Sequence, residues 1–191
     1  MKAISPGRQL SSRVIILGAV IGLSLSALLV LRVPSSEARV KVGKLPKESI
    51  ARQQLPLRDG RQLSLADLRG QVVVLDFFAV WCGHSRDHIP ALTRFKDEDR
   101  QRGLQIIGLA VQDKETTAER LNQFIKDQKI DYSVGLVSNR AFSNYIDSRD
   151  ISVPQTLVYS RDGRLAAYFV GQSAEIDAAL AAAISRELEK Q

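Results

Sequence analysis

The chain has 191 residues, of which 45% are apolar, and this length accommodates one domain of ordinary size plus an appendage. Residues 1–50 carry eight Lys or Arg residues against two acidic ones, a balance that equals the net charge of +6 for the whole chain, whereas residues 51–191 carry 19 of each sign. The charge therefore describes a basic tail beside a membrane and excludes a nucleic-acid-binding face.

The N-terminal region has the pattern of a membrane-directed segment. Residues 14–31 form a run of 18 without a charge, which as a helix extends about 27 Å, close to the thickness of a hydrocarbon core. We expect a basic tail at 1–13, a signal-anchor transmembrane helix at 14–33 and a polar linker at 34–50. A cleaved secretory signal is the alternative, because Ser36-Glu37-Ala38 offers the small residues of a cleavage site.

Residues 51–191 have the pattern of one α/β domain. The turn residues Arg58-Asp59-Gly60 predict a small N-terminal hairpin, and residues 64–67 predict a short helical turn. Nearly continuous apolar runs predict buried strands at 72–78 and 104–111. The remaining periodicity predicts helices at 83–102, 116–129, 141–147 and 174–189, and strands at 132–137, 155–160 and 164–170. This order indicates a sheet that is parallel at first and ends in an antiparallel hairpin.

Cys82 is the only cysteine of the chain, so no intramolecular disulfide can form. It follows a predicted strand and opens a predicted helix, where unpaired N–H groups favour the reactive thiolate. His84 stands in the same first turn and can add a positive charge or a hydrogen bond. A buried structural thiol is the alternative, but the adjacent Trp81 and the position at a helix start argue against it.

Two motifs carry a resemblance to a known family. Residues 82–92, Cys-Gly-His-Ser-Arg-Asp-His-Ile-Pro-Ala-Leu, are similar to the Cys-x-x-Cys-Arg-x-x-x-Pro-x-Leu motif of the membrane-tethered TlpA/ResA-like branch of the thioredoxin-like superfamily. Residues 153–163 resemble the cis-proline loop, strand and turn of that family. The resemblance covers roughly residues 53–188 and implies a thioredoxin fold, a central mixed sheet flanked by helices, on the extracytoplasmic side of a bacterial membrane.

The resemblance also assigns roles to single residues. Asp76 matches a buried acid that moves a proton for the second thiol, and the alternative is a strand Asp bonded to a lysine or water. Pro154 is expected to follow a cis peptide bond, with Val153 offering backbone groups to an extended substrate beside Trp81.

Ser85 departs from the family, because a dithiol enzyme has its second cysteine there. The serine is interpreted as a hydroxyl donor to the Cys82 thiolate, as a tolerated small residue in a site without redox activity, or as an engineered change. His88 is predicted to be a surface residue, and the run Asp113-Lys114-Glu115 is predicted to be solvated. Because no further ligands group nearby, we expect neither a metal nor a cofactor.

These patterns favour thiol-disulfide exchange through one nucleophilic cysteine, with protein or small-molecule thiols and disulfides as partners. A single thiol suits disulfide isomerisation or the removal of small-thiol caps. One alternative is a redox-silent binding or chaperone module that uses the cis-proline groove. The other is a thiol peroxidase, which the absence of a Thr-x-x-Cys sequence disfavours.

Overall fold

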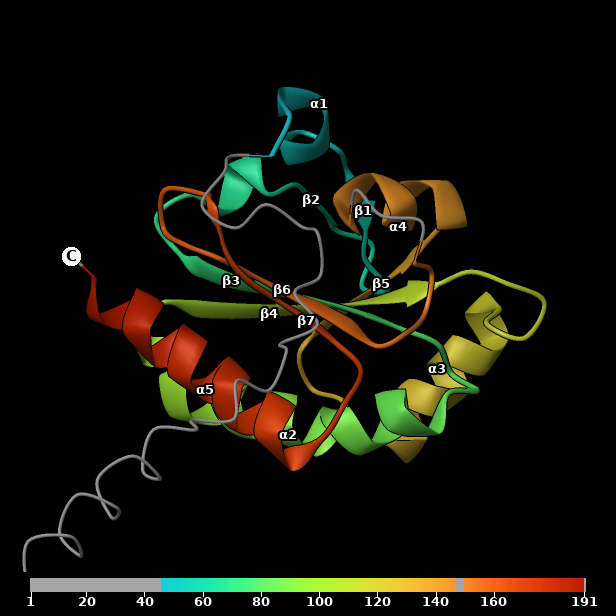
Figure 1. The fold of residues 1–191 in the computed structure, drawn as a ribbon. Coiled ribbons are helices and arrows are strands. Elements are labelled where there is room, and N and C mark those ends of the chain that lie inside the picture. The colour runs from blue at the N-terminus through green and yellow to red at the C-terminus, as the bar shows by residue number, and fades with distance from the viewer. Residues whose placement is uncertain (1–45, 147–149, 191) are drawn as a thin grey trace, which may run out of the picture. The chain divides into compact units, whose positions relative to one another are not determined.

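The structure is a computed structural model that describes residues 46–146 and 150–190. Its centre is a five-stranded sheet in the order β5-β4-β3-β6-β7, in which β3, β4 and β5 are parallel and β6 and β7 are antiparallel to their neighbours (Figure 1). The strands are β3 (Val72–Phe78), β4 (Leu104–Val111), β5 (Ser133–Val137), β6 (Gln155–Tyr159) and β7 (Leu165–Val170). This confirms the predicted mixed sheet and its late hairpin.

Helices cover both faces of this sheet (Figure 1). On one face lie α2 (Gly83–Asp99), α3 (Ala118–Asp127) and α5 (Ala174–Glu189). On the other face lie α1 (Glu48–Ala51), α4 (Asn139–Ile146) and a two-stranded sheet of β1 (Leu55–Pro56) and β2 (Gln62–Leu63). Short 3-10 turns, η1 (Ala66–Leu68) and η2 (Arg100–Arg102), complete the described elements. The arrangement is the predicted thioredoxin fold with its N-terminal hairpin.

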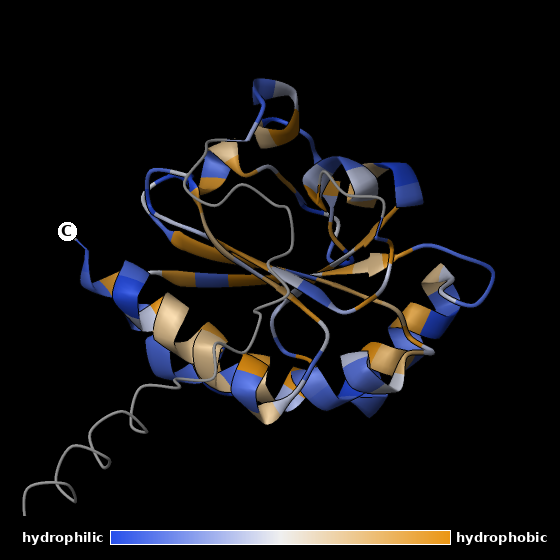
Figure 2. Cartoon of the chain, viewed as in Figure 1, coloured by the Kyte–Doolittle hydropathy of each residue, from blue (hydrophilic) through white to orange (hydrophobic). Residues whose placement is uncertain are grey.

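Strand β3 is buried along its whole length because both of its faces are covered. Its side chains alternate: Val72, Val74 and Phe78 join the core beneath α2, α3 and α5, and Val73, Leu75 and Phe77 join the core beneath α4. The central strands are correspondingly hydrophobic, while polar residues gather on the outer sides of the helices (Figure 2). By this alternation Asp76 is the one polar side chain that β3 sends toward the layer of α2 and α5.

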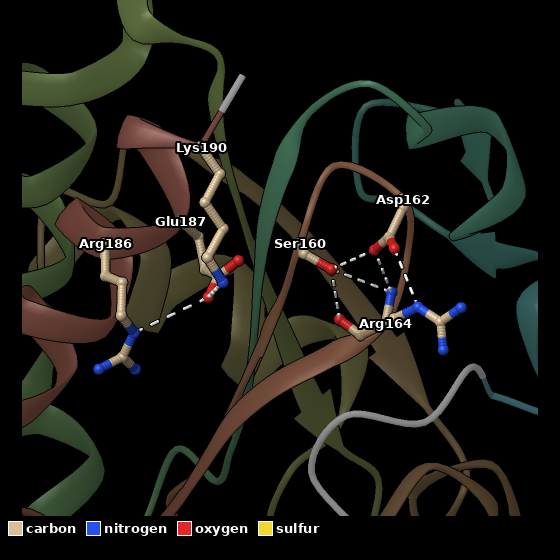
Figure 3. Close-up of polar contacts among 6 residues, drawn as sticks. All are labelled: Ser160, Asp162, Arg164, Arg186, Glu187 and Lys190. Carbon is tan, nitrogen blue, oxygen red and sulfur yellow. Dashed lines mark hydrogen bonds and ion pairs between the residues drawn. The ribbon is translucent and has the colours of Figure 1, made fainter.

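The turn between β6 and β7 confirms the predicted hairpin at residues 161–163. Gly163 has a φ of 77°, a conformation that glycine adopts at low cost. Asp162 accepts hydrogen bonds from the Ser160 hydroxyl and from the backbone N–H and side chain of Arg164 (Figure 3). Figure 3 also shows Glu187, near the end of α5, paired with Lys190.

Element boundaries differ from the predictions by a few residues. Strand β1 is shorter than the predicted 53–57, whereas β2 matches the predicted 62–63. Helix α3 begins at Ala118 because the Thr117 hydroxyl caps it by accepting the N–H of Arg120. The helix α1 crosses the predicted domain boundary at residue 51, and the Tyr145 hydroxyl bonds to the carbonyl of Ile50. No helix among the described residues is long and apolar enough to span a bilayer, and the predicted membrane helix at 14–33 lies outside them.

Candidate active site

Cys82 occupies the start of helix α2, directly after the turn that leaves β3. It is the N-cap residue, with φ of −80° and ψ of 119°, and its side chain is 9% exposed. The first turn of α2 carries no acidic residue, so no negative charge competes with a thiolate at the positive end of this helix. Cys82 is thus a largely buried thiol at the positive end of a helix.

The cis-proline loop lies against this sulfur. The peptide bond between Val153 and Pro154 is cis, and the Cys82 thiol donates a hydrogen bond of 3.4 Å to the Val153 carbonyl. Cys82 and Val153 are 71 positions apart in the sequence. The structure thus brings together Cys82, Val153 and Pro154, which sequence reasoning had placed in one site.

Trp81 is 51% exposed and is held in place beside Cys82. Its indole N–H donates a hydrogen bond of 2.6 Å to Asp113 Oδ2, and Asp113 Oδ1 accepts the backbone N–H groups of Glu115 and Thr116. Burial acts to raise the pKa of Asp113, but these hydrogen bonds outweigh it and lower the pKa. Asp113 is exposed, as predicted for a solvated run, and its carboxylate in addition holds the indole of Trp81.

Ser85 and His84 differ in exposure. Ser85 is fully buried, and its hydroxyl accepts the backbone N–H of Ala79 at 3.5 Å. No hydrogen bond joins Ser85 to Cys82 in the part of the chain that the structure describes. His84 is exposed in the first turn of α2. Both residues stand near the sulfur in sequence, but only Ser85 takes part in the packing beneath it.

Asp76 is 1% exposed and belongs to a buried polar cluster. Its Oδ1 accepts the Thr156 hydroxyl at 3.0 Å and lies 3.9 Å from His88 Nε2. Burial raises the pKa of Asp76, although the nearby His88 and the Thr156 hydroxyl act in the opposite direction. Asp76 therefore keeps its proton to a higher pH than an exposed aspartate does.

The prediction that His88 is a surface residue was wrong. Its side chain is 0% exposed, with Nε2 at 3.2 Å from the Thr156 hydroxyl and Nδ1 at 2.9 Å from Asp177 Oδ1. The signal was present in the sequence, because His88 precedes Leu92 and Phe95 by four and seven residues and so shares their inward face. Asp177 and Thr156 had no such local signal, since α5 and β6 bring them to the cluster.

The fold and this arrangement define a class: a thioredoxin-fold protein with one thiol at a helix start, a cis-proline loop against it and a buried aspartate in the central strand β3. Residues 46–168 match the AhpC/TSA family, and the chain belongs to this family.

Curated relatives are thiol-disulfide oxidoreductases by name. The chain is 23% identical over 118 residues to the thiol-disulfide oxidoreductase ResA of Bacillus subtilis (strain 168), covering 61% of this chain and 63% of that protein. It is 21% identical over 115 residues to ResA of Bacillus anthracis, covering 60% and 63%. The chain thus spans less than two-thirds of the length of these relatives.

Solved structures share the fold. A thiol:disulfide interchange protein of the thioredoxin family from Chlorobium tepidum TLS superposes with a TM-score of 0.63 at 25% identity, covering 78% of this chain and 97% of that one. A secreted Mycobacterium tuberculosis disulfide oxidoreductase superposes with a TM-score of 0.59 at 14% identity, covering 73% and 99%. These matches confirm the predicted thioredoxin-like family and its ResA-like relatives.

Proposed function

We propose that this protein exchanges thiols and disulfides through Cys82 alone. The observation that carries the proposal is the position of the sulfur, at the start of α2 and 3.4 Å from the Val153 carbonyl. Cys82 aligns with the first cysteine of the Cys-x-x-Cys motif that residues 82–92 resemble, and the relatives are thiol-disulfide oxidoreductases by name.

The chemistry proceeds in two displacements. The Cys82 thiolate attacks one sulfur of a substrate disulfide, so that one S–S bond breaks, another forms, and the substrate's other sulfur leaves as a thiolate and takes up a proton. A thiol from the substrate or from solution then loses its proton, attacks the substrate sulfur of this mixed disulfide and releases Cys82. The two steps exchange disulfide partners without net oxidation, which suits isomerisation and the removal of small-thiol caps.

The groups around the sulfur have distinct roles in this proposal. The Val153 carbonyl and the Trp81 ring border the place where an extended substrate lies. Cys82 attacks from the start of α2, with His84 in the same turn, and Asp76 accepts or supplies a proton. Ser85 fills the position of a second thiol with a hydroxyl that bonds to the backbone. No cofactor takes part in this reaction.

The test is to incubate the full chain with oxidised glutathione and follow its intact mass. We expect one adduct per chain, on Cys82, forming about tenfold faster than in the same chain unfolded in urea, because only the fold supplies the helix start. The unfolded chain is a matched control with the same single thiol. Equal rates in the two states would contradict the proposal.

A second candidate is a peptide-binding module in which Cys82 is dispensable. It is favoured by two large exposed apolar side chains, Trp81 and Ile151, which is 66% exposed and precedes the cis-proline loop. The Cys82→Ser variant discriminates the two functions. Unchanged affinity of the variant for an unfolded, cysteine-free polypeptide would support binding, and undetectable affinity in both chains would exclude it.

We further propose that residues 14–33 anchor the domain on the extracytoplasmic side of a bacterial membrane. The support is the uncharged run in the sequence and the basic residues that precede it. The chain should remain in membranes washed with alkaline carbonate and be digested by protease added from the outer side. A soluble chain beginning after Ala38 would instead show that the segment is a cleaved signal.

A further inference from the structure

A continuous line of polar contacts runs from Asp76 to the protein surface. Asp76 Oδ1 lies 3.0 Å from the Thr156 hydroxyl, which lies 3.2 Å from His88 Nε2. On the other side of the imidazole, Nδ1 lies 2.9 Å from Asp177 Oδ1. The four residues come from β3, β6, α2 and α5, so the fold itself assembles the line.

The line ends where water can reach it. Asp76 and His88 are 1% and 0% exposed, whereas the side chain of Asp177 is 20% exposed. Asp177 lies in the first turn of α5, whose positive end favours a carboxylate. Its second oxygen accepts the Gln172 amide at 3.3 Å. Asp177 therefore connects the buried imidazole with solvent.

The hydrogen bonds can be completed in two ways that differ only in proton position. In the first, protonated Asp76 donates to the Thr156 hydroxyl, which donates to Nε2 of a neutral His88. In the second, each of these protons has moved along its own hydrogen bond: the Thr156 hydroxyl donates to the Asp76 carboxylate and Nε2–H of a cationic His88 donates to Thr156. In both, Nδ1–H donates to Asp177, so every polar group keeps a partner.

Few other ionisable groups interact with these four residues. Tyr132, which precedes β5, is 9% exposed, and both its burial and the charge of Asp76 raise the pKa of its phenol. Its hydroxyl has no hydrogen-bond partner among the described residues, so it does not compete for the proton. The groups that interact with Asp76 and His88 are thus Tyr132 before β5, Thr156 from β6 and Asp177 from α5.

We propose that Asp76, Thr156, His88 and Asp177 form a proton relay that lets the buried Asp76 exchange its proton with solvent. This role rests on the proposed disulfide exchange, in which a thiol that attacks gives up a proton and a thiolate that leaves takes one up. Asp76 takes the proton, the Thr156 hydroxyl passes one to His88, and Asp177 delivers one to water; the reverse order recharges Asp76. His88 and Asp177 are positioning residues, since they act through Asp76.

The imidazole tautomer tests the relay without any thiol chemistry. Nitrogen-15 NMR of the full chain, with the signal of His88 assigned by His88→Gln, should show neutral His88 protonated at Nδ1. In Asp177→Ala the proton should move to Nε2, and in the matched control Glu175→Gln, a first-turn acid of the same helix, it should stay on Nδ1. Neutral His88 protonated at Nε2 in the unaltered chain would overturn the relay.

The second readout is the pH profile for release of a Cys82–glutathione mixed disulfide by added thiol. His88→Gln and Asp177→Asn should each slow release at neutral pH by about tenfold, as removal of an orienting hydrogen-bond partner does, and change the shape of the profile. Profiles that superpose on those of the unaltered chain and Glu175→Gln would overturn the relay. Because the tautomer is also measurable in Cys82→Ser, absence of disulfide exchange would refute the proposed function alone.

Discussion

The outward and inward sides of helix α2 make a useful comparison. At its start, Cys82 lies between the exposed Trp81 and the cis-proline loop, and these residues belong to two short motifs of the sequence. Three residues past Ser85, His88 faces inward to a polar cluster whose members come from four separate elements. One helix thus carries Cys82 at its start and a buried polar cluster on its inner side, and the two depend on different parts of the sequence.

The largest expected effect comes from restoring a second thiol on the outward side. Ser85→Cys places a thiol one turn from Cys82, and an intramolecular thiol acts at a high effective concentration. We expect mixed disulfides of this variant to be released at least about a hundredfold faster than by millimolar added thiol. Quenched-flow mass measurement checks the rate. Ser143→Cys, a serine of α4, is the matched control, and equal release by both variants would show that the position does not act as we propose.

The two histidines of α2 should contribute differently to the free energy of unfolding, because His88 is buried and His84 is exposed. His88→Ala removes one hydrogen-bond partner from Thr156, which keeps Asp76, and one from Asp177, which keeps Gln172, and should lower the free energy of unfolding by about 2 kcal/mol. His84→Ala, at an exposed position, should change it by less than about 0.5 kcal/mol but slow the alkylation of Cys82. Urea unfolding and alkylation kinetics measure the two effects. Equal losses of stability would contradict this difference between the two sides.

The pH dependence of stability reports on Asp76. Because burial raises its folded pKa above the ordinary value of 3.8, the folded state holds a proton that the unfolded state has released, and stability falls as pH rises above about 4 toward the folded pKa. Asp76→Asn keeps an acceptor for Thr156 and removes this loss. The variant should therefore gain stability relative to the unaltered chain as pH rises through this window. A difference that is constant with pH would contradict the raised pKa.

The smallest expected effect concerns the support of Trp81. Asp113→Ala removes the acceptor of the indole N–H and of two backbone N–H groups, and should cost about 1 kcal/mol. Because Trp81 is the only tryptophan of the chain, its fluorescence anisotropy reports directly on this ring. Anisotropy should fall in Asp113→Ala and stay unchanged in Lys114→Ala. Unchanged anisotropy in both variants would mean that the hydrogen bond to Asp113 does not hold the Trp81 ring in place.

The Cys82 side of the site and most of the fold can be predicted from local sequence. The apolar runs of β3 and β4, the start of α2 at Cys82 and the cis bond at Pro154 are each encoded within a few residues, so their prediction succeeded. The inward side depends on the register that pairs Asp76 with Thr156 and on the docking of α5, which brings Asp177 to His88. The spacing of His88 from Leu92 and Phe95 indicates its inward position, but only these long-range contacts identify its polar partners.

We propose that Cys82 is the only protein thiol in the reaction, so that a thiol from outside the protein is needed to release the substrate. The most direct test is the release rate of a preformed Cys82–glutathione mixed disulfide in the full chain, measured by intact mass against the concentration of added thiol. The account predicts a line through the origin, with no release when thiol is absent. A finite rate at zero thiol would show that a group within the protein displaces the substrate, and would contradict the claim.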